Sequence, residues 1–206
     1  MTRHGFLRLA LAGALTAGLA QTALAGPPLV CFPFEIGTAA SLPWNSSSGS
    51  YRGMRSDYDL TRLNSDVIAL LTPSTPVIVR METLRRAALY ASADAAVAHG
   101  LLDTIRTPAE RSAPDALARF DAGYLIETYR QMAPFAPAMA AMIRDLDGYK
   151  IVTASLEARH GDPAIAFAAA LIASGKGAYG EHVRMARAGA NTDLLLAKNI
   201  NHVTNR

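Results

Sequence analysis

The chain has 206 residues, of which 50% are hydrophobic and 18% are charged, and its formal net charge at pH 7 is +3. This length suits one domain with a sizeable buried core. The basic residues are scattered among the acids without a dense run, which argues against a nucleic-acid-binding surface. Cys31 is the only cysteine, so no internal disulfide can form and packing must stabilise the fold.

Residues 1–25 have the pattern of an export signal. Arg3 and Arg8 give a basic start, an apolar stretch rich in small residues follows, and residues 23–25 read Ala-Leu-Ala, a small-x-small cleavage pattern. We therefore expect a periplasmic or secreted protein. The apolar stretch is shorter than the ~20 residues of a spanning helix, so no membrane span is expected after cleavage. Retention of the signal as an anchor is the alternative.

Residues 26–56 are rich in Pro, Gly and Ser, with aromatic residues set among them. Neither helical nor strand periodicity runs through them, so we expect an irregular N-terminal segment. Its aromatic part, from Cys31 to Trp44, is interpreted as a cap over an open end of the helical body, because the end of a repeat array lacks a neighbour. The alternative is that this part lies in a groove and belongs to a ligand site.

From residue 57 onward the sequence is rich in Ala, Leu and Arg, and apolar residues recur at three- and four-residue steps, which predicts helices. Thr75-Pro76, Asp94 and Asp162-Pro163 are predicted helix starts. Thr107 and Glu110 have the spacing of a capping box that starts another helix, with Pro114 as a second possible start. The predicted helices span approximately residues 57–72, 76–91, 94–106, 107–133, 137–148, 149–161, 162–171, 180–188 and 192–202.

Alternate predicted helices start near residues 77, 115, 148 and 180, a spacing of about thirty-odd residues that is typical of helical-hairpin repeats. Each hairpin can bury its apolar stripe only against a neighbouring hairpin. The sequence therefore predicts an all-α fold over residues 57–206, in which helical hairpin repeats stack as a short α-solenoid.

These hairpins resemble tetratricopeptide-type repeats over roughly residues 76–202, with similar features at Asp162-Pro163, Phe167 and Ala170. The chain also resembles a group of uncharacterised exported bacterial proteins through three blocks, residues 31–37, 41–44 and 80–86. The two resemblances imply export and a helical-repeat body. They imply no catalytic residue.

No complete catalytic set is recognised in the sequence. There is no Gly-x-Ser-x-Gly turn, and residues 174–180 lack the order of a phosphate-binding loop. Glu157 and His160 form a single Glu-x-x-His pair, whereas carboxylate-bridged di-iron bundles need two. We therefore assign no catalytic residue, no metal site and no cofactor.

Candidate binding residues are chosen by their side-chain chemistry, because aromatic rings with polar tips suit a groove and a lone cysteine is either a small buried residue or a reactive thiol. They are Cys31, Phe34, Glu35, Trp44, Tyr124 and Tyr149. We expect a protein whose concave helical surface binds a peptide or protein partner. The alternative is an envelope enzyme or metal-binding protein that uses Cys31, Glu35 and a histidine brought close by the fold.

Overall fold

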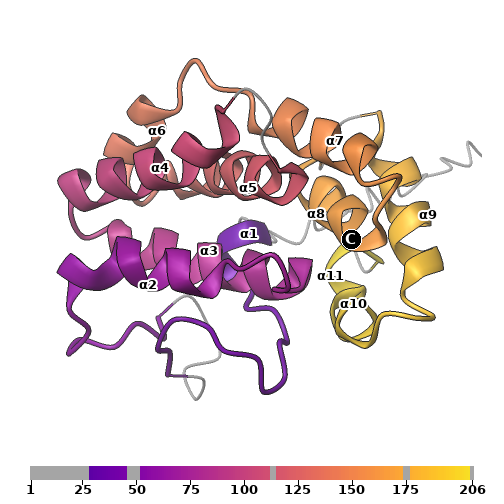
Figure 1. The fold of residues 1–206 in the computed structure, drawn as a ribbon, viewed down its shortest axis with the longest axis horizontal. Helices are drawn as coiled ribbons and strands as arrows, with labels where there is room; N and C mark the ends of the chain where they lie inside the picture. The colour runs from indigo at the N-terminus through magenta and orange to yellow at the C-terminus, as the bar shows by residue number, and fades with distance from the viewer. Residues whose placement is uncertain (1–27, 46–51, 112–114, 174–176, 205–206) are drawn as a thin grey trace, which may run out of the picture.

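The computed structural model describes residues 28–45, 52–111, 115–173 and 177–204, and the predicted export signal, residues 1–25, lies outside these ranges. The described residues form helices and no strand, which confirms the predicted all-α class. The helices, shown in Figure 1, are α1 (Pro28–Cys31), the 3-10 helix η2 (Leu60–Arg62), α2 (Leu63–Leu70), α3 (Val77–Ala91), α4 (Ala95–Ala109), α5 (Ala116–Met132), α6 (Pro137–Met142), α7 (Gly148–Ala158), α8 (Pro163–Ile172), α9 (Tyr179–Gly189), α10 (Leu194–Asn199) and α11 (Asn201–Thr204).

Three helices form the centre of the fold. In α8, every residue from Ala164 to Ile172 is buried, and α3 and α5 are buried over most of their surfaces. Helix α5 packs against α3, α4, α6, α7 and α8, while α8 also packs against α9. A helix in a simple stack buries only one apolar stripe. Helices α3, α5 and α8 are buried on most sides, so further segments must cover them.

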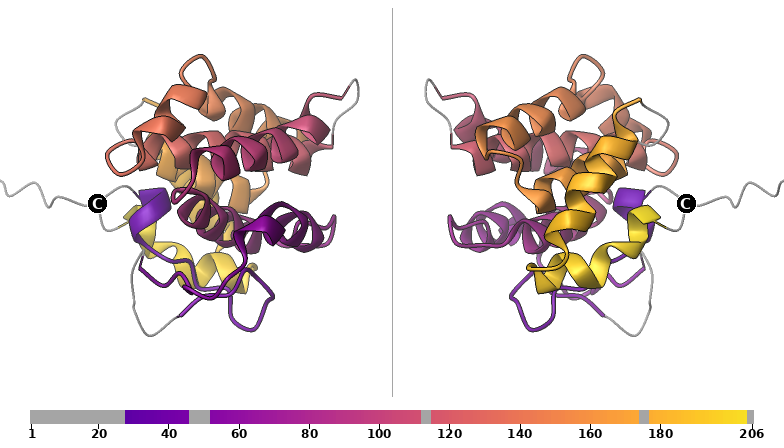
Figure 2. Two further views of the ribbon diagram at one scale, coloured as in Figure 1. Left: turned by 90° about the vertical axis from the view of Figure 1, so that its left-hand side faces the viewer. Right: turned by 90° about the vertical axis from the view of Figure 1, so that its right-hand side faces the viewer.

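That cover comes from the N-terminal segment. Helix α1 contacts α3, α5 and α8 together, and Leu29, Val30 and Phe34 are buried in the same core as these helices. Figure 2 shows α1 beside the C-terminal helices from two opposite sides. The segment predicted to be irregular thus begins with one helical turn and closes one side of the bundle.

Close helix approach depends on glycine where α5 crosses α7. A Cβ atom added at Gly148 would lie 2.5 Å from the backbone oxygen of Gly123, and one added at Gly123 would lie 2.8 Å from that of Gly148. Contacts this short are impossible for real side chains, so each glycine allows the other helix to approach. This crossing sets the position of α7 along α5.

Local capping explains where several helices start. Asp94 accepts hydrogen bonds from the backbone amides of Ala96 and Val97, and Asp162 caps α8 in the same way with Pro163 at the first position, so both predicted starts are confirmed. At Thr75-Pro76 the helix starts one residue later than predicted, with Pro76 as the N-cap instead of the first helical residue. The Thr75 hydroxyl does not cap α3, because it donates to the Leu70 carbonyl at the end of α2.

The predicted capping box at Thr107 is wrong. Helix α4 continues through Pro108 to Ala109, and the Thr107 hydroxyl donates back to the carbonyl oxygen of Asp103. Proline is tolerated there because it lies in the last turn of the helix, where a single lost amide hydrogen bond does not interrupt a longer run. The next helix, α5, starts at Ala116, two residues beyond the alternative start at Pro114.

Candidate functional site

The structure anchors the N-terminal candidates to helix α3 through a buried ionic cluster. The carboxylate of Glu82 accepts hydrogen bonds from Arg85 Nε at 2.7 Å, from Arg86 Nε at 2.6 Å and from the Phe34 amide at 3.0 Å. Arg85 and Arg86 also donate to the carbonyl oxygens of Val30 and Leu42. The three sequence blocks at residues 31–37, 41–44 and 80–86 therefore belong to one structural unit.

Phe34 and Trp44 pack within this unit. The buried Phe34 ring meets the edge of Phe167 with the ring centroids 6.1 Å apart, and the half-buried Trp44 ring meets Tyr90 in the same manner. The guanidinium of Arg85 lies 4.9 Å from the centre of the Trp44 ring, a cation-π distance. These contacts pack the segment against α8 and α3.

Cys31 and Glu35 occupy different environments. Cys31 is a free, half-buried thiol, and burial raises its pKa above the ordinary value while nearby Arg85 acts in the opposite direction. Glu35 is exposed, and its backbone, not its carboxylate, is fixed by Asn199, which bonds both the amide and the carbonyl at 2.9 Å. A thiol with a raised pKa carries little thiolate at neutral pH, which is the opposite of an activated nucleophile.

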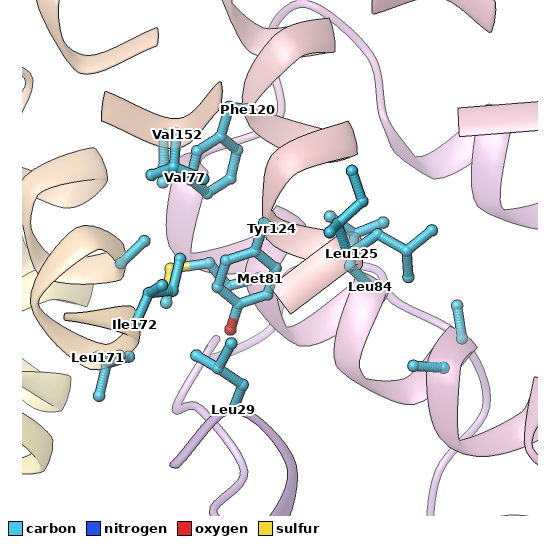
Figure 3. Packing of buried hydrophobic residues seen from close by; sticks show 14 of the residues in the cluster. Leu29, Val77, Met81, Leu84, Phe120, Tyr124, Leu125, Val152, Leu171 and Ile172 are labelled. Carbon is cyan, nitrogen blue, oxygen red and sulfur yellow. The ribbon is translucent and has the colours of Figure 1, made fainter. Parts of the chain in front are cut away.

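The two tyrosine candidates have different surroundings. Tyr124 is fully buried, and Figure 3 shows its hydroxyl directed toward Leu29 in the core. That hydroxyl has no hydrogen-bond partner among the described residues, and burial raises its pKa well above the ordinary value. Tyr149, on α7, is half-buried and its hydroxyl lies 2.9 Å from Nε2 of His182 on α9. The structure thus does not bring the six candidates into one site.

The metal-binding alternative receives no support from geometry. Among the described residues, no group of three or more His, Cys, Asp and Glu side chains is placed to hold a metal ion. The histidine beside the N-terminal segment is His202, and its ring packs on Phe32 and Phe34. His160 lies beyond the end of α7 with a positive φ of 53°, so it does not share a helical face with Glu157.

A cleft that sequence reasoning missed opens between α4, α5 and α7. Its volume is about 530 Å³, within the range of ligand-binding pockets. Helix α5 contacts both neighbours and contributes Ala122 and Ile126 to the floor, and α7 contributes Ile151 to the lining. We call it the α4–α7 cleft; its lining residues are Arg106, Ala109, Glu110, Arg119, Ala122, Ile126, Asp145, Leu146, Asp147, Lys150, Ile151 and Ala154.

Charged side chains of both signs surround this apolar floor. Arg106 and Glu110 pair with each other at 2.5 Å, and Asp147 caps α7 by accepting from the Lys150 amide. In the part of the chain that the structure describes, the side chains of Arg119, Asp145 and Lys150 make no hydrogen bond or ion pair. Two cations and one anion at the cleft are therefore available to a ligand.

The link that carries Asp145 and Asp147 is held in place from α5. Arg130 donates to the carbonyl oxygen of Leu146 at 2.5 Å and pairs with Glu127 at 3.2 Å. Because Leu146 lines the cleft, this contact fixes the side of the cleft that precedes α7. The floor and this side are thus set by packing and hydrogen bonding before any ligand arrives.

A smaller pocket is lined by residues of α2, α3, α4 and α5 and of the segments next to them. Its volume is about 110 Å³. At its base Arg80 of α3 donates to Asp121 Oδ2 of α5 at 2.5 Å, and both side chains are nearly fully buried. The remaining lining residues are Ile68, Leu71, Pro73, Ile105, Pro108, Asp115 and Ala118, and we call the whole the Arg80–Asp121 pocket.

Burial governs the protonation of Asp121. It raises the pKa of this carboxyl to about 7, while the charge of Arg80 acts in the opposite direction and that of Asp115 in the same one. The folded protein therefore retains a proton that the unfolded chain has already released near pH 4. The resulting stabilisation is complete below about pH 4 and is lost as the pH rises through about 7.

We expect the free energy of unfolding to include an Asp121 contribution that falls by a few kcal/mol, at about 1.4 kcal/mol per unit of pKa shift, between pH 4 and pH 8. Urea unfolding of the wild type and of Asp121→Asn at several pH values measures it, because the variant has no carboxyl at this position. The two pH profiles should diverge through this window. Parallel profiles would contradict the assignment.

Comparison with known proteins finds no family model that matches the chain, and no curated protein or solved structure is significantly similar to it. Among the helices that the structure describes, none combines the length and the apolar character needed to cross a membrane. The α4–α7 cleft is thus the candidate site of this fold.

Proposed function

We propose that this chain is an exported binding protein of the bacterial periplasm, built of stacked helical hairpins, that holds a peptide segment of a partner protein in the α4–α7 cleft. The observation that carries the proposal is the combination of a cleft of about 530 Å³, an apolar floor and charges of both signs that lack partners among the described residues. The pairwise packing of α3 with α5 and of α5 with α7 supports the hairpin arrangement.

The chemistry of the cleft indicates the kind of peptide. Leu146 and Ile151, which are both half-buried, offer an apolar surface for one or two aliphatic or aromatic side chains. Arg119 and Lys150 can pair with an acidic side chain or a terminal carboxylate, and Asp145 can pair with a basic group. A short segment with an apolar centre flanked by opposite charges satisfies all of these groups together.

Selection from a random peptide library tests the proposal, with Ala154→Trp as the diagnostic variant. Ala154 is exposed and lines the cleft, so an indole there occupies the space of the ligand without disturbing the core. We expect the variant to bind selected peptides at least about tenfold more weakly than the wild type, because an anchoring side chain contributes more than ~1.4 kcal/mol.

The matched control is Ala158→Trp, which places the same side chain on an exposed position of the same helix outside the cleft. It should bind the selected peptides as the wild type does. Failure to enrich any peptide on the folded protein, or equal binding by Ala154→Trp, would refute the proposed site. Reversing charge with Arg119→Glu should further shift selection away from acidic peptides.

A further inference from the structure

Two rings join the start of α9 to the start of α7. Nε2 of His182, in the first turn of α9, lies 2.9 Å from the hydroxyl oxygen of Tyr149 in the first turn of α7. The rings meet edge to face with their centroids 6.0 Å apart, and His182 is only 7% exposed. Helices α7 and α9 both pack on α8, so this ring contact links two neighbours of the same central helix.

The second nitrogen of the His182 ring is buried without a partner. Nδ1 makes no hydrogen bond with the described residues. A neutral imidazole carries one proton, on either nitrogen. Because a buried N–H without an acceptor is rarer than a buried acceptor without a donor, we assign the proton to Nε2, which donates it to the Tyr149 hydroxyl oxygen. Nδ1 then carries only a lone pair.

A second proton on the His182 ring would have no acceptor. It would bind Nδ1 and place a charged donor in a buried position, which is costly. Burial accordingly lowers the pKa of His182 below its ordinary value, while the charge of Glu181 acts in the opposite direction. The protonated ring is thus better accommodated in water than against Tyr149.

The charged groups around the two rings do not offset this cost. Glu181 is 66% exposed and lies 3.9 Å from Arg184, so solvent and a second charge weaken its attraction for the ring. On α7, Asp147 acts on Tyr149, whose pKa is raised by burial and then by this charge. Of the other helices that pack on α9, α8 has no titratable side chain, and Lys198 of α10 is exposed.

Of the two joined helices, α7 is held more firmly. Its first residue, Gly148, packs against the backbone of Gly123, and the Ser155 hydroxyl donates to the Ala116 carbonyl of α5 at 2.6 Å. The N-cap of α9, Ala178, makes no side-chain hydrogen bond, so the first turn of α9 lacks this local anchor. Loss of the ring contact therefore frees the first turn of α9 and leaves α7 in place.

We propose that the contact between Tyr149 and His182 is an acid-released latch. The neutral ring holds the first turn of α9 against α7, and a proton on Nδ1 detaches it. Tyr179 of the same turn donates to the Val203 carbonyl of α11 at 2.6 Å, so the release extends to the C-terminal helix. This device is separate from the α4–α7 cleft and goes beyond the peptide-binding function proposed for it.

The direction of the pH effect follows from the two states of the ring. A detached His182 is in water and has the ordinary pKa of about 6.5, above that of the latched ring. The latch is therefore complete above about pH 6.5 and is lost as the pH falls below it. Each pH unit in this range raises the detached population by up to about tenfold, until the latched ring itself takes up the proton.

Amide hydrogen exchange of the full chain at pH 7 and pH 5 tests the proposal, with the protection factor of the Val183 amide in α9 as the readout. We expect this factor to be at least about fivefold lower at pH 5. In His182→Gln it should not fall, because a glutamine amide can donate to Tyr149 but takes up no proton. His99→Gln, which changes an exposed histidine of α4, should behave as the wild type.

Tyr149→Phe provides a second variant whose fold is not at risk, because Tyr149 is half-buried and the ring is kept. It should lower the Val183 protection factor severalfold already at pH 7, since the hydrogen bond is absent at every pH. Ring ¹H–¹⁵N spectra of the wild type should show His182 with its proton on Nε2 at pH 7.5 and a titration midpoint below 6.5.

Three results would overturn the proposal. They are an equal fall of Val183 protection in the wild type and in His182→Gln, unchanged protection in Tyr149→Phe, and a His182 ring that titrates at or above pH 6.5. The pH dependence of Asp121 does not confuse the comparison, because this carboxyl is present in the wild type and in every variant. No peptide ligand enters the test, so its outcome is independent of the function proposed for the cleft.

Discussion

Gly148→Ala is expected to lower the free energy of unfolding by about 3 kcal/mol, at the upper end of the usual cost of overpacking. The added Cβ would lie 2.5 Å from the backbone oxygen of Gly123 and 2.8 Å from the side chain of Glu127. The Gly123 oxygen belongs to the middle of α5 and cannot move without bending that helix, so α7 must move away. Urea unfolding followed by circular dichroism measures the loss.

Gly180→Ala is the matched control. Gly180 lies in the first turn of α9, and a Cβ added there meets no atom within 4 Å. The same substitution should therefore leave stability unchanged or raise it by up to ~1 kcal/mol through helix propensity. If Gly148→Ala were as stable as Gly180→Ala, the close crossing of α5 and α7 would be wrong.

Glu82→Gln is expected to cost about 3–5 kcal/mol, the range found when one partner of a buried ion pair is removed. Glu82 and Arg85 are both fully buried, and the substitution leaves the Arg85 guanidinium without a counter-charge. The amide also has one oxygen in place of two, while Arg85, Arg86 and the Phe34 amide all donate to the carboxylate. Fluorescence of Trp44, the only tryptophan, monitors unfolding beside the cluster.

A surface pair provides the comparison for this substitution. Arg106 and Glu110 approach to 2.5 Å, but their side chains are 32% and 58% exposed, so Glu110→Gln should change stability by less than about 1 kcal/mol. The double variant Glu82→Gln with Arg85→Met should cost less than the sum of the two single substitutions, because it removes the unpaired charge. Additive costs would show that the pair acts through packing alone.

Helix starts were predictable from the sequence where the determining contacts are local. Asp94 and Asp162 bond amides two and three residues ahead, so the signal and its cause lie in the same short segment. Thr107 was misread because the same hydroxyl can bond backward to Asp103, and only the length of α4 decides between the two. The all-α class follows from apolar periodicity, which is also a local signal.

The burial of charge on α3 could not be predicted in this way. Arg80, Glu82 and Arg85 alternate with apolar residues as they would on a solvated helix face, yet the three side chains are almost entirely buried. They are covered by α1 and the residues that follow it, and by α5, which lie far away in the sequence. No spacing rule within α3 contains that information.

The α4–α7 cleft was missed for a related reason. Its floor consists of ordinary core residues such as Ala122 and Ile126, and its charges come from three separate segments without a shared motif. The sequence contains one signal for the Arg80–Asp121 pocket, which is the acid at position 121. Asp121 lies among the residues from Phe120 to Tyr129, all of which are buried in the structure. An acid within an apolar helical run indicates either an ion pair or a ligand.

The two hydrogen bonds between the Asn199 side chain and the Glu35 backbone have a consequence for synthesis of the protein. They join positions 164 residues apart, and the neighbouring Phe34 ring packs on Phe167 and His202. A ribosome therefore releases Leu29 and Phe34 long before it makes the residues that cover them. Until residue 202 has emerged, Phe34 lacks part of its cover, and apolar surface exposed in this way makes a partly synthesised chain prone to aggregation.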